Sequence, residues 1–261
     1  MDDRDVAIVV AQQGAAVVRR RFGASLSRID KGAGDFATDA DVEAERAMLA
    51  VLRRERSEDG VVAEESGRSG VTGSPRTWLL DPLCGALNYA AGMRVAAVNV
   101  ALRRDGRCLA AAVADPFSDE VFWSVGNGAF VRAGGHDTRL APDARSRLID
   151  LNLDLPFPSA PTLDIRPLAV DPGFASGFRL RVVSSSLALT WVACGRRAAY
   201  VTDGDIRDSV HFAAGLTICE AAGCVVTDLA GRDWRSGTAG LVATADRETH
   251  AVLLARLRAQ T

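Results

Sequence analysis

The sequence predicts a layered α/β fold, on three observations. A chain of 261 residues suits a single α/β unit and can bury a sizeable core. Segments with helical periodicity alternate with short apolar runs that are typical of buried strands. An Asp105-Gly106 pair between two apolar runs is a hairpin signal. We expect one unit over residues 1–261, with an N-terminal half over about 1–135 and a C-terminal half over 136–261.

Two helices are predicted near the start of the chain. Residues 2–22 form an amphipathic pattern, and the arginines at 19–21 lie in its last turn, where cations complement the helix dipole. Residues 39–56 form a second pattern, with Met48 among its inward apolar residues. Its expected N-cap is Thr38 or Asp39, because both side chains can accept a hydrogen bond from the first helical turn.

Strands dominate the middle of the chain. Trp78-Leu79-Leu80 is a short apolar run that predicts a buried strand. Further strands are expected over 95–102, 109–113, 121–125 and 129–132. The stretch 134–178 is partly rich in Pro, Gly and Asp and carries one expected strand at 148–155. Its loops are long enough to hold substrate contacts.

The last third again mixes helices and strands. Helices are expected over 186–195, 209–222 and 249–258, and strands over 198–201 and 225–227. This continued mixture is what predicts layers of helices and strands.

Composition excludes several classes of protein. The formal net charge of −2 gives no electrostatic footprint for nucleic acid. No apolar run reaches the ~18–20 residues that span a bilayer, and the acidic N-terminus lacks a secretory pattern. Five cysteines form an odd number without a Cys-x-x-Cys pair, which favours reduced thiols. We therefore expect a cytoplasmic protein with no membrane and no nucleic-acid partner.

One segment carries most of the chemistry: Asp81-Pro82-Leu83-Cys84-Gly85-Ala86, directly after the apolar run at 78–80. It resembles the inositol monophosphatase superfamily signature, Trp-(apolar)2-Asp-Pro-Leu/Ile-Asp-Gly-Thr/Ser. The resemblance implies Mg²⁺ ligands at Asp81, at the backbone carbonyl of Leu83 and at position 84, and a water-activating hydroxyl at position 86. Here Cys84 stands at the second Asp position and Ala86 at the hydroxyl position.

A second motif lies upstream and contains Lys31, the only lysine of the chain. The stretch Lys31…Asp35…Thr38…Asp41 is similar to the family's Lys…Asp-(x)2-Thr-x-x-Asp. By that resemblance Asp41 is the base partner of the nucleophilic water, and Asp35 and Thr38 shape the loop. Lys31, Thr38 and Asp41 are thus the expected catalytic residues.

Two further motifs supply expected metal ligands. Glu64-Glu65-Ser66 looks like the family's Gly-Glu-Glu-Ser, whose first Glu binds metal. The run that begins at His211 looks like Trp-Asp-x-Ala-Ala-Gly…Glu-Ala-Gly/Ala-Gly, whose Asp is another ligand. That Asp becomes His211, or Val210 in the register of branches with one more residue of spacing. No Asp sits at the position in either register.

Less chemical stretches also match, over 114–120, 126–130 and 181–186, so the resemblance covers roughly residues 31–245 in the family's order. It implies a five-layer α-β-α-β-α sandwich and a small phosphorylated or anionic metabolite as ligand. Family members are often homodimers, and we expect one here.

The resemblance does not decide how many metal ions the site binds or which ones. A first Mg²⁺ would use Glu64, Asp81 and the Leu83 carbonyl, a set that is intact. A second ion would use Asp81 and positions 84 and 211, where thiolate and imidazole suit Mg²⁺ poorly. Either that metal is lost, or Asp81, Cys84 and His211 form a mixed site that suits Zn²⁺ or Fe²⁺. Without metal, Cys84 would be a small buried thiol and His211 a helix-start histidine bonded to backbone.

A phosphate site is expected independently of the metals. Gly85 and Ala86 would open a helix after the Asp-Pro turn, beside Cys84, and free N–H groups there attract anions. Alternatively, Gly85 serves only the tight turn.

Two functions follow from these residues. One is an enzyme on a small phosphorylated sugar, cyclitol or nucleotide, with weakened Mg²⁺-dependent phosphate-monoester hydrolysis or repurposed chemistry. The other is a catalytically degenerate binding protein that retains the anion pocket. Glu64, Asp81, Asp41 and Lys31 favour the first function, whereas Cys84, Ala86 and His211 favour the second.

Overall fold

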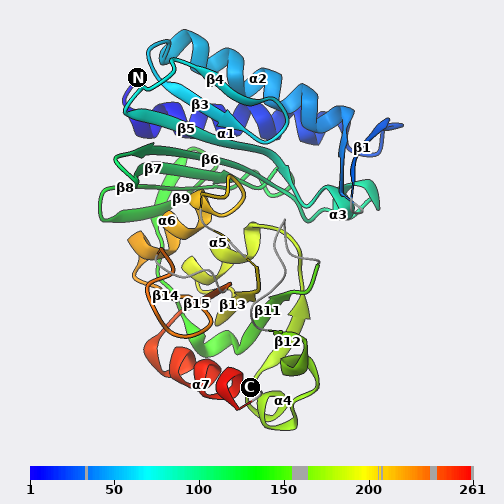
Figure 1. Ribbon diagram of the computed structural model, residues 1–261, viewed down its shortest axis with the longest axis vertical. Helices are drawn as coiled ribbons and strands as arrows, with labels where there is room; N and C mark the ends of the chain where they lie inside the picture. Colours follow the sequence, from blue (N-terminus) through cyan, green and yellow to red (C-terminus); the bar gives the residue numbers. More distant parts are fainter. Residues whose placement is uncertain (33–34, 155–163, 205, 207, 236–239, 260–261) are drawn as a thin grey trace. The chain divides into compact units, whose positions relative to one another are not determined.

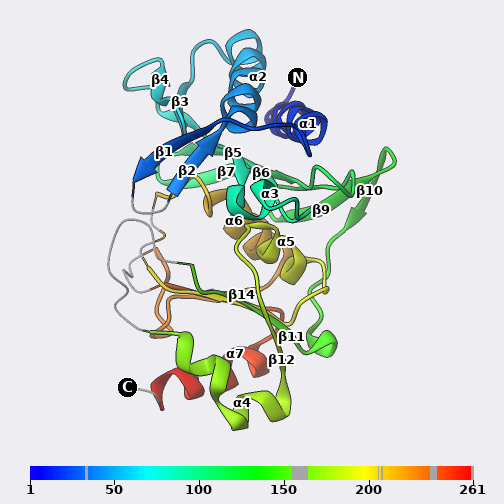
Figure 2. The ribbon, with the colours of Figure 1, turned by 90° about the vertical axis from the view of Figure 1, so that its right-hand side faces the viewer.

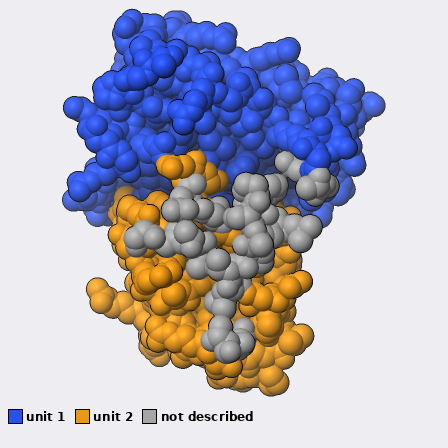
Figure 3. All heavy atoms as spheres, in the orientation of Figure 1, with its two compact units in different colours: residues 1–139, 185–187, 210–218 blue, residues 140–184, 188–209, 219–261 orange. Residues whose placement is uncertain are grey.

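The computed structural model describes residues 1–32, 35–154, 164–204, 206, 208–235 and 240–259 (Figure 1). These residues form helices and several sheets, which confirms the predicted mixed α/β class. Contacts divide the chain into two compact units, coloured separately in Figure 3. Unit 1 holds residues 1–139, 185–187 and 210–218, and unit 2 holds residues 140–184, 188–209 and 219–261.

Unit 1 is built on an eight-stranded sheet with the strand order β10-β9-β8-β7-β6-β5-β3-β4. The strands are β3 (Gly60–Ala63), β4 (Gly67–Gly70), β5 (Arg76–Cys84), β6 (Ala97–Arg104), β7 (Arg107–Ala114), β8 (Val121–Val125), β9 (Gly128–Ala133) and β10 (His136–Arg139). Neighbouring strands pair antiparallel except for β3 and β5, which are parallel. A separate antiparallel ribbon joins β1 (Arg28–Gly32) and β2 (Asp35–Thr38).

Helices α1 (Asp3–Arg21) and α2 (Asp39–Glu55) pack side by side on one face of this sheet (Figure 2). Their buried alanines, valines and leucines join the central strands in one core. Gly14 permits the close approach, because a Cβ there would lie 2.8 Å from both Met48 Sδ and Val98 Cγ1. Thr38 is the N-cap of α2, as one of the two expected residues, and its side chain accepts from Ala40 N.

The hairpin expected at Asp105-Gly106 joins β6 and β7. Both turn residues have positive φ, 50° and 75°, which the tight turn between twisted strands requires. The strand predicted at 78–80 is longer than expected: β5 continues to Cys84. Its pairing with β6 shifts between Asp81 and Cys84, so a bulge redirects the chain at this point.

Unit 2 contains a mixed five-stranded sheet with the order β12-β11-β13-β15-β14. Its strands are β11 (Leu148–Asn152), β12 (Arg179–Val182), β13 (Ala199–Thr202), β14 (Val225–Thr227) and β15 (Leu241–Thr244). Helix α7 (Arg247–Arg258) contacts β15, and its buried leucines join the core of the unit. The helix α4 (Pro172–Gly177) and the 3-10 turns η1 (Ala144–Ser146) and η2 (Arg166–Val170) lie between strands.

Several boundaries differ from those expected. The strand predicted at 148–155 ends at Asn152, and residues 155–163 lie outside the described residues. The helices predicted at 186–195 and 209–222 are shorter: α5 spans Leu187–Ala193 and α6 spans Ala213–Ala222. His211 therefore lies in the turn before α6 and not at its first residue. No helix in the described part of the chain is long and apolar enough to cross a membrane.

Candidate functional site

The candidate site is built in unit 1 around Asp81, which the β5 bulge places beside β6. Asp81 is fully buried. Its Oδ1 accepts a hydrogen bond from Leu83 N at 3.1 Å, and its Oδ2 accepts one from Asn99 Nδ2 at 3.1 Å. The two bonds fix the carboxylate at the sheet edge, where a buried charge requires partners.

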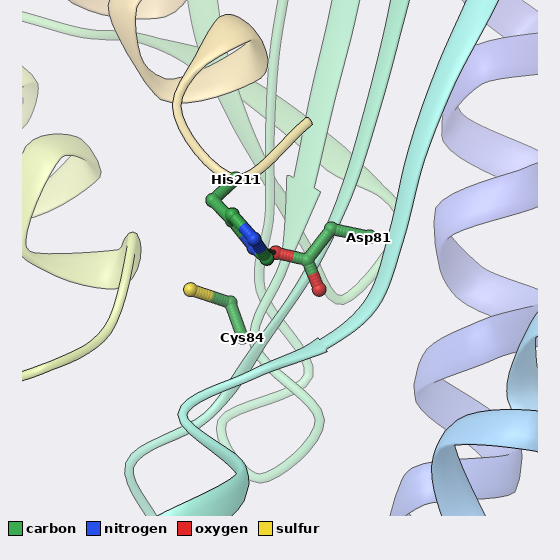
Figure 4. Close-up of side chains that lie close together, drawn as sticks. All are labelled: Asp81, Cys84 and His211. Carbon is green, nitrogen blue, oxygen red and sulfur yellow. Dashed lines mark hydrogen bonds and ion pairs between the residues drawn. The ribbon is translucent and has the colours of Figure 1, made fainter. Parts of the chain in front are cut away.

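His211 supplies the shortest of these contacts to the Asp81 carboxylate. Its Nδ1 lies 2.7 Å from Asp81 Oδ2 (Figure 4). Burial lowers the pKa of His211, but the adjacent Asp81 carboxylate more than offsets this and raises the pKa well above its usual value. Burial acts against ionisation of Asp81 too, and the His211 charge holds the pKa of that carboxyl below its usual value. The pair is thus an imidazolium–carboxylate ion pair.

Cys84 completes a cluster of three donor groups. The ligand atoms of Asp81, Cys84 and His211 all lie within 4.8 Å of one another. Figure 4 shows the three side chains converging from the β5 segment and from the turn before α6. The Cys84 Sγ accepts the N–H of Ser186 at 3.2 Å. Burial, followed by the Asp81 charge, raises the pKa of the thiol.

Two polar residues for which the sequence predicts no role tie this cluster together. The hydroxyl of Ser186 donates to Asn99 Oδ1 at 2.9 Å, and Asn99 in turn donates to Asp81. Asn99 lies on β6 opposite Asp81, so its role follows from strand register, which one sequence does not reveal.

Glu64 lies at the end of β3, where its backbone N–H donates to Leu80 O at 3.1 Å. Its Oε1 accepts from Lys31 Nζ at 2.9 Å. Its Oε2 is buried 3.9 Å from His211 Nδ1, and among the described residues no hydrogen-bond partner reaches it. Burial and then the Asp81 charge raise the pKa of Glu64 well above its usual value.

Lys31 and Glu45 position the turn that carries Glu64. Lys31 Nζ also binds Glu65 Oε1 at 2.8 Å, so it bridges two neighbouring carboxylates. Glu45, on α2 and almost fully buried, accepts the backbone N–H groups of Glu65 and Ser66 at 2.8 and 2.9 Å. The sequence offered no signal for Glu45, because a glutamate on an amphipathic helix is ordinarily solvated.

Asp41 and Thr38 form a pair at the start of α2. Asp41 Oδ2 accepts from Thr38 N at 2.8 Å and from Thr38 Oγ1 at 2.5 Å. Burial raises the pKa of Asp41 to about 6, against the lowering effect of the Thr38 hydrogen bonds. A carboxyl with such a pKa can exchange a proton near neutral pH.

The residues expected to bind phosphate lie at the start of a very short helix. Helix α3 spans only Ala86–Ala90, and its N-cap Gly85 has a φ of 100°, a left-handed conformation that favours glycine. Leu83 is buried, and Cys84 is partly buried. The turn interpretation of Gly85 therefore has direct support, whereas anion binding at residues 84–86 stays a prediction.

Comparison with known proteins places this chain in a family. The model of the inositol monophosphatase family matches residues 2–261. An inositol-1-monophosphatase of Caulobacter vibrioides is 32% identical over 260 residues, which cover 97% of this chain and 99% of that protein. The chain belongs to the inositol monophosphatase family.

Solved structures agree on the fold. The extragenic suppressor protein suhB of Bartonella henselae superimposes with a TM-score of 0.83 at 25% identity, covering 97% of each chain. The Thermotoga maritima IMPase superimposes with a TM-score of 0.80 at 20% identity, covering 99% of this chain and 97% of that one. The fold class that the sequence predicted is thus confirmed as the inositol monophosphatase type.

The family is generally Mg²⁺-dependent and acts on small phosphorylated substrates. The donor set fits one hard cation, because the buried Glu64 Oε2 has no hydrogen-bond partner in the described part of the chain and Asp81 lies beside it. It does not fit a second Mg²⁺. A thiol and an imidazole are poor ligands for that ion, and the His211 ring already holds Asp81 Oδ2.

Proposed function

We propose that the chain acts on a small phosphorylated sugar, cyclitol or nucleotide as a divergent phosphate-monoester hydrolase whose Mg²⁺-dependent activity is weak. One observation carries this proposal: Asp81 is fully buried, and the Oε2 atom of the neighbouring, partly buried Glu64 has no hydrogen-bond partner among the described residues. Family membership supplies the substrate class.

The roles of the residues follow from their contacts. An Mg²⁺ ion held by Glu64, Asp81 and the Leu83 carbonyl would neutralise charge on the ester and lower the pKa of a water. Asp41 would accept the proton of the attacking water, with Thr38 orienting its carboxylate. Lys31 would keep Glu64 and Glu65 from repelling the substrate. Ala86 offers no hydroxyl to orient the water, and this absence weakens the reaction.

A second candidate function is a binding protein that holds the phosphorylated metabolite without hydrolysing it. The His211–Asp81 ion pair favours it, because a protein cation then occupies the carboxylate that would hold both metals. The anion would bind beside residues 84–86.

The experiment is a phosphatase panel of inositol monophosphate, sugar phosphates and nucleoside monophosphates with Mg²⁺ and Mn²⁺. We expect turnover to be lower than that of an ordinary phosphatase, by a factor on the order of 10²–10³ for each missing catalytic group. Turnover at an ordinary rate, roughly 1–10³ per second, would contradict the proposal. Binding of a phosphonate analogue without any turnover would favour the second function.

We also propose a cytoplasmic homodimer that binds no nucleic acid, on the grounds of family membership and the net charge of −2. Light scattering on a sizing column tests the oligomer, and a monomer at micromolar concentration would contradict it. Retention of labelled DNA or RNA at 0.15 M salt would contradict the absence of a nucleic-acid partner.

A further inference from the structure

We propose that Glu64 joins Asp81, Cys84 and His211 in a four-ligand site for a divalent transition metal of the Zn²⁺ class. The donor atoms of Asp81, Cys84 and His211 already lie within 4.8 Å of one another. The fourth donor is Glu64 Oε2, which lies 3.9 Å from His211 Nδ1. The site does not depend on whether the protein hydrolyses phosphate esters.

One pair of donor atoms has nearly the spacing that a tetrahedral ion requires. Zn²⁺ binds O, N and S donors at about 2.0–2.3 Å, so its ligand atoms lie roughly 3.3–3.8 Å apart. The separation of His211 Nδ1 and Glu64 Oε2 is close to that value. The 2.7 Å contact between His211 and Asp81 is shorter because a proton lies between the two atoms. A metal ion would replace this proton, and the two donors would separate by about 0.6 Å.

Glu64 Oε2, for which the described residues supply no hydrogen-bond partner, is the second observation that points to a cation. A buried carboxylate oxygen without a partner is costly, and native structures rarely leave one. Lys31 holds the other oxygen, and Glu45 holds the turn, so the orientation of the carboxylate is fixed from two sides. An ion between Glu64 and His211 would give Oε2 its missing partner.

A dication also reduces the negative charge of the site. Glu64, Asp81 and a deprotonated Cys84 contribute three negative charges, and Glu65, which shares Lys31 with Glu64, adds a fourth. A dication and the Lys31 ammonium together offset three of these four charges when His211 is neutral. The thiolate and imidazole select Zn²⁺, Co²⁺ or Fe²⁺ over Mg²⁺ and Ca²⁺.

The ligands are oriented by neighbours, as in protein metal sites generally. Asn99 donates to Asp81, and the Ser186 N–H donates to Cys84 Sγ. With four protein ligands the coordination shell is closed, which is typical of structural ions. A consequence that rests on the proposed function is that Zn²⁺ takes Glu64 and Asp81 away from Mg²⁺ and so inhibits turnover.

Cobalt is the probe, because its spectrum reports both geometry and sulfur ligation without any turnover. Full-length protein is stripped with a chelator and titrated with Co²⁺. We expect one equivalent to give intense visible bands of a tetrahedral ion and a thiolate-to-cobalt charge-transfer band. Added Zn²⁺ should remove both. An octahedral spectrum without the sulfur band would overturn the proposal, even if the phosphatase panel succeeded.

Variants identify the ligands. Cys84→Ser should abolish the sulfur band, whereas Cys108→Ser should keep it. Cys108 is a matched control, since it lies on β7 opposite Arg103, four residues or about 13 Å along β6 from Asn99. Glu64→Gln should keep the band but weaken Co²⁺ affinity by about tenfold or more. Unchanged affinity in Glu64→Gln would overturn the four-ligand site.

A measurement on the unaltered protein covers the case in which a variant fails to fold. Zn²⁺ should slow alkylation of Cys84 by iodoacetamide, as mapped by peptide mass, and leave the alkylation of Cys108 unchanged. Equal alkylation of Cys84 with and without Zn²⁺ would overturn the proposal.

Discussion

At the scale of single residues, the site compensates the negative charges of its buried and partly buried carboxylates with protein cations. His211 pairs with Asp81, and Lys31 bridges Glu64 and Glu65. Removing one partner of a buried pair leaves an uncompensated charge, which costs far more than a surface pair contributes. The side chains at positions 31 and 211 therefore support the fold of the site as well as its chemistry.

His211→Ala should lower the free energy of unfolding by roughly 3 kcal/mol, because Asp81 loses its cation while it stays buried. Urea denaturation in chelator measures this change. His136→Ala, at an exposed position on β10, is the control and should cost little. An equal effect of the two substitutions would show that the ion pair contributes nothing.

Asp41 gives the stability a specific pH dependence. Folding raises its pKa from 3.8 to about 6, so the native state binds the proton more tightly than the unfolded state does. This contribution is present below about pH 4 and is lost as pH rises through 6. Asp41→Asn keeps an oxygen for Thr38 but removes the titration.

The difference in unfolding free energy between wild type and Asp41→Asn should therefore shift by roughly 2–3 kcal/mol in favour of the variant between pH 4 and pH 7. Denaturation at a series of pH values measures it, with Asp39→Asn as the control for a lost charge in the same helical turn. A difference that does not vary with pH would contradict the account.

At the scale of elements, the sequence predicted the helices and strands that have a clear hydrophobic periodicity or a specific turn. The patterns for α1, α2 and the β6–β7 hairpin are long or carry a specific turn, and the structure contains all three. β5 was underestimated, because Pro82 and Asp81 interrupt its apolar run although the bulge accommodates them. β12 was missed because it is an edge strand with mostly exposed side chains.

For the site too, the sequence predicted the residues that belong to recognisable motifs and missed those whose roles depend on the fold. Motif resemblance named Glu64, Asp81, Cys84 and His211, and the structure brings these four together. Between the two registers considered, it is the side chain of residue 211 that meets Asp81. Asn99, Ser186 and Glu45 could not be named, because their roles depend on strand pairing and on backbone groups that meet only in the folded chain.

Helix α2 controls the site through Glu45. Glu45→Gln replaces one acceptor by an N–H donor that faces a backbone N–H, so one hydrogen bond is lost and one buried donor is left unpaired. We expect a loss of about 1–3 kcal/mol in unfolding free energy. Co²⁺ affinity should also fall, because the turn with Glu64 loosens. Glu43→Gln, on the same helix and half-exposed, is the control; a Co²⁺ affinity in Glu45→Gln equal to that of this control would contradict the positioning role.

At the scale of the whole molecule, the chain keeps the family fold, and we propose that its site differs from the family pattern at two metal-ligand positions and at one hydroxyl position. The chain matches the family over residues 2–261, and its two units each keep their own sheet and core. The fold alone therefore does not determine the reaction of this protein, because the function depends on the residues of the site. The central claim is that Cys84, Ala86 and His211 alone separate this protein from an ordinary Mg²⁺ phosphatase.

The most direct test is a Mg²⁺ titration of phosphatase activity in wild type and in a variant that combines Cys84→Asp, Ala86→Thr and His211→Asp. The three changes rebuild the hard ligand set and the hydroxyl. Activity and Mg²⁺ affinity should rise together, activity by on the order of 10²-fold or more. The single substitutions should do little, because ligands of one ion act as a unit. A folded triple variant, verified by its unfolding midpoint, that gains neither activity nor Mg²⁺ affinity would contradict the account.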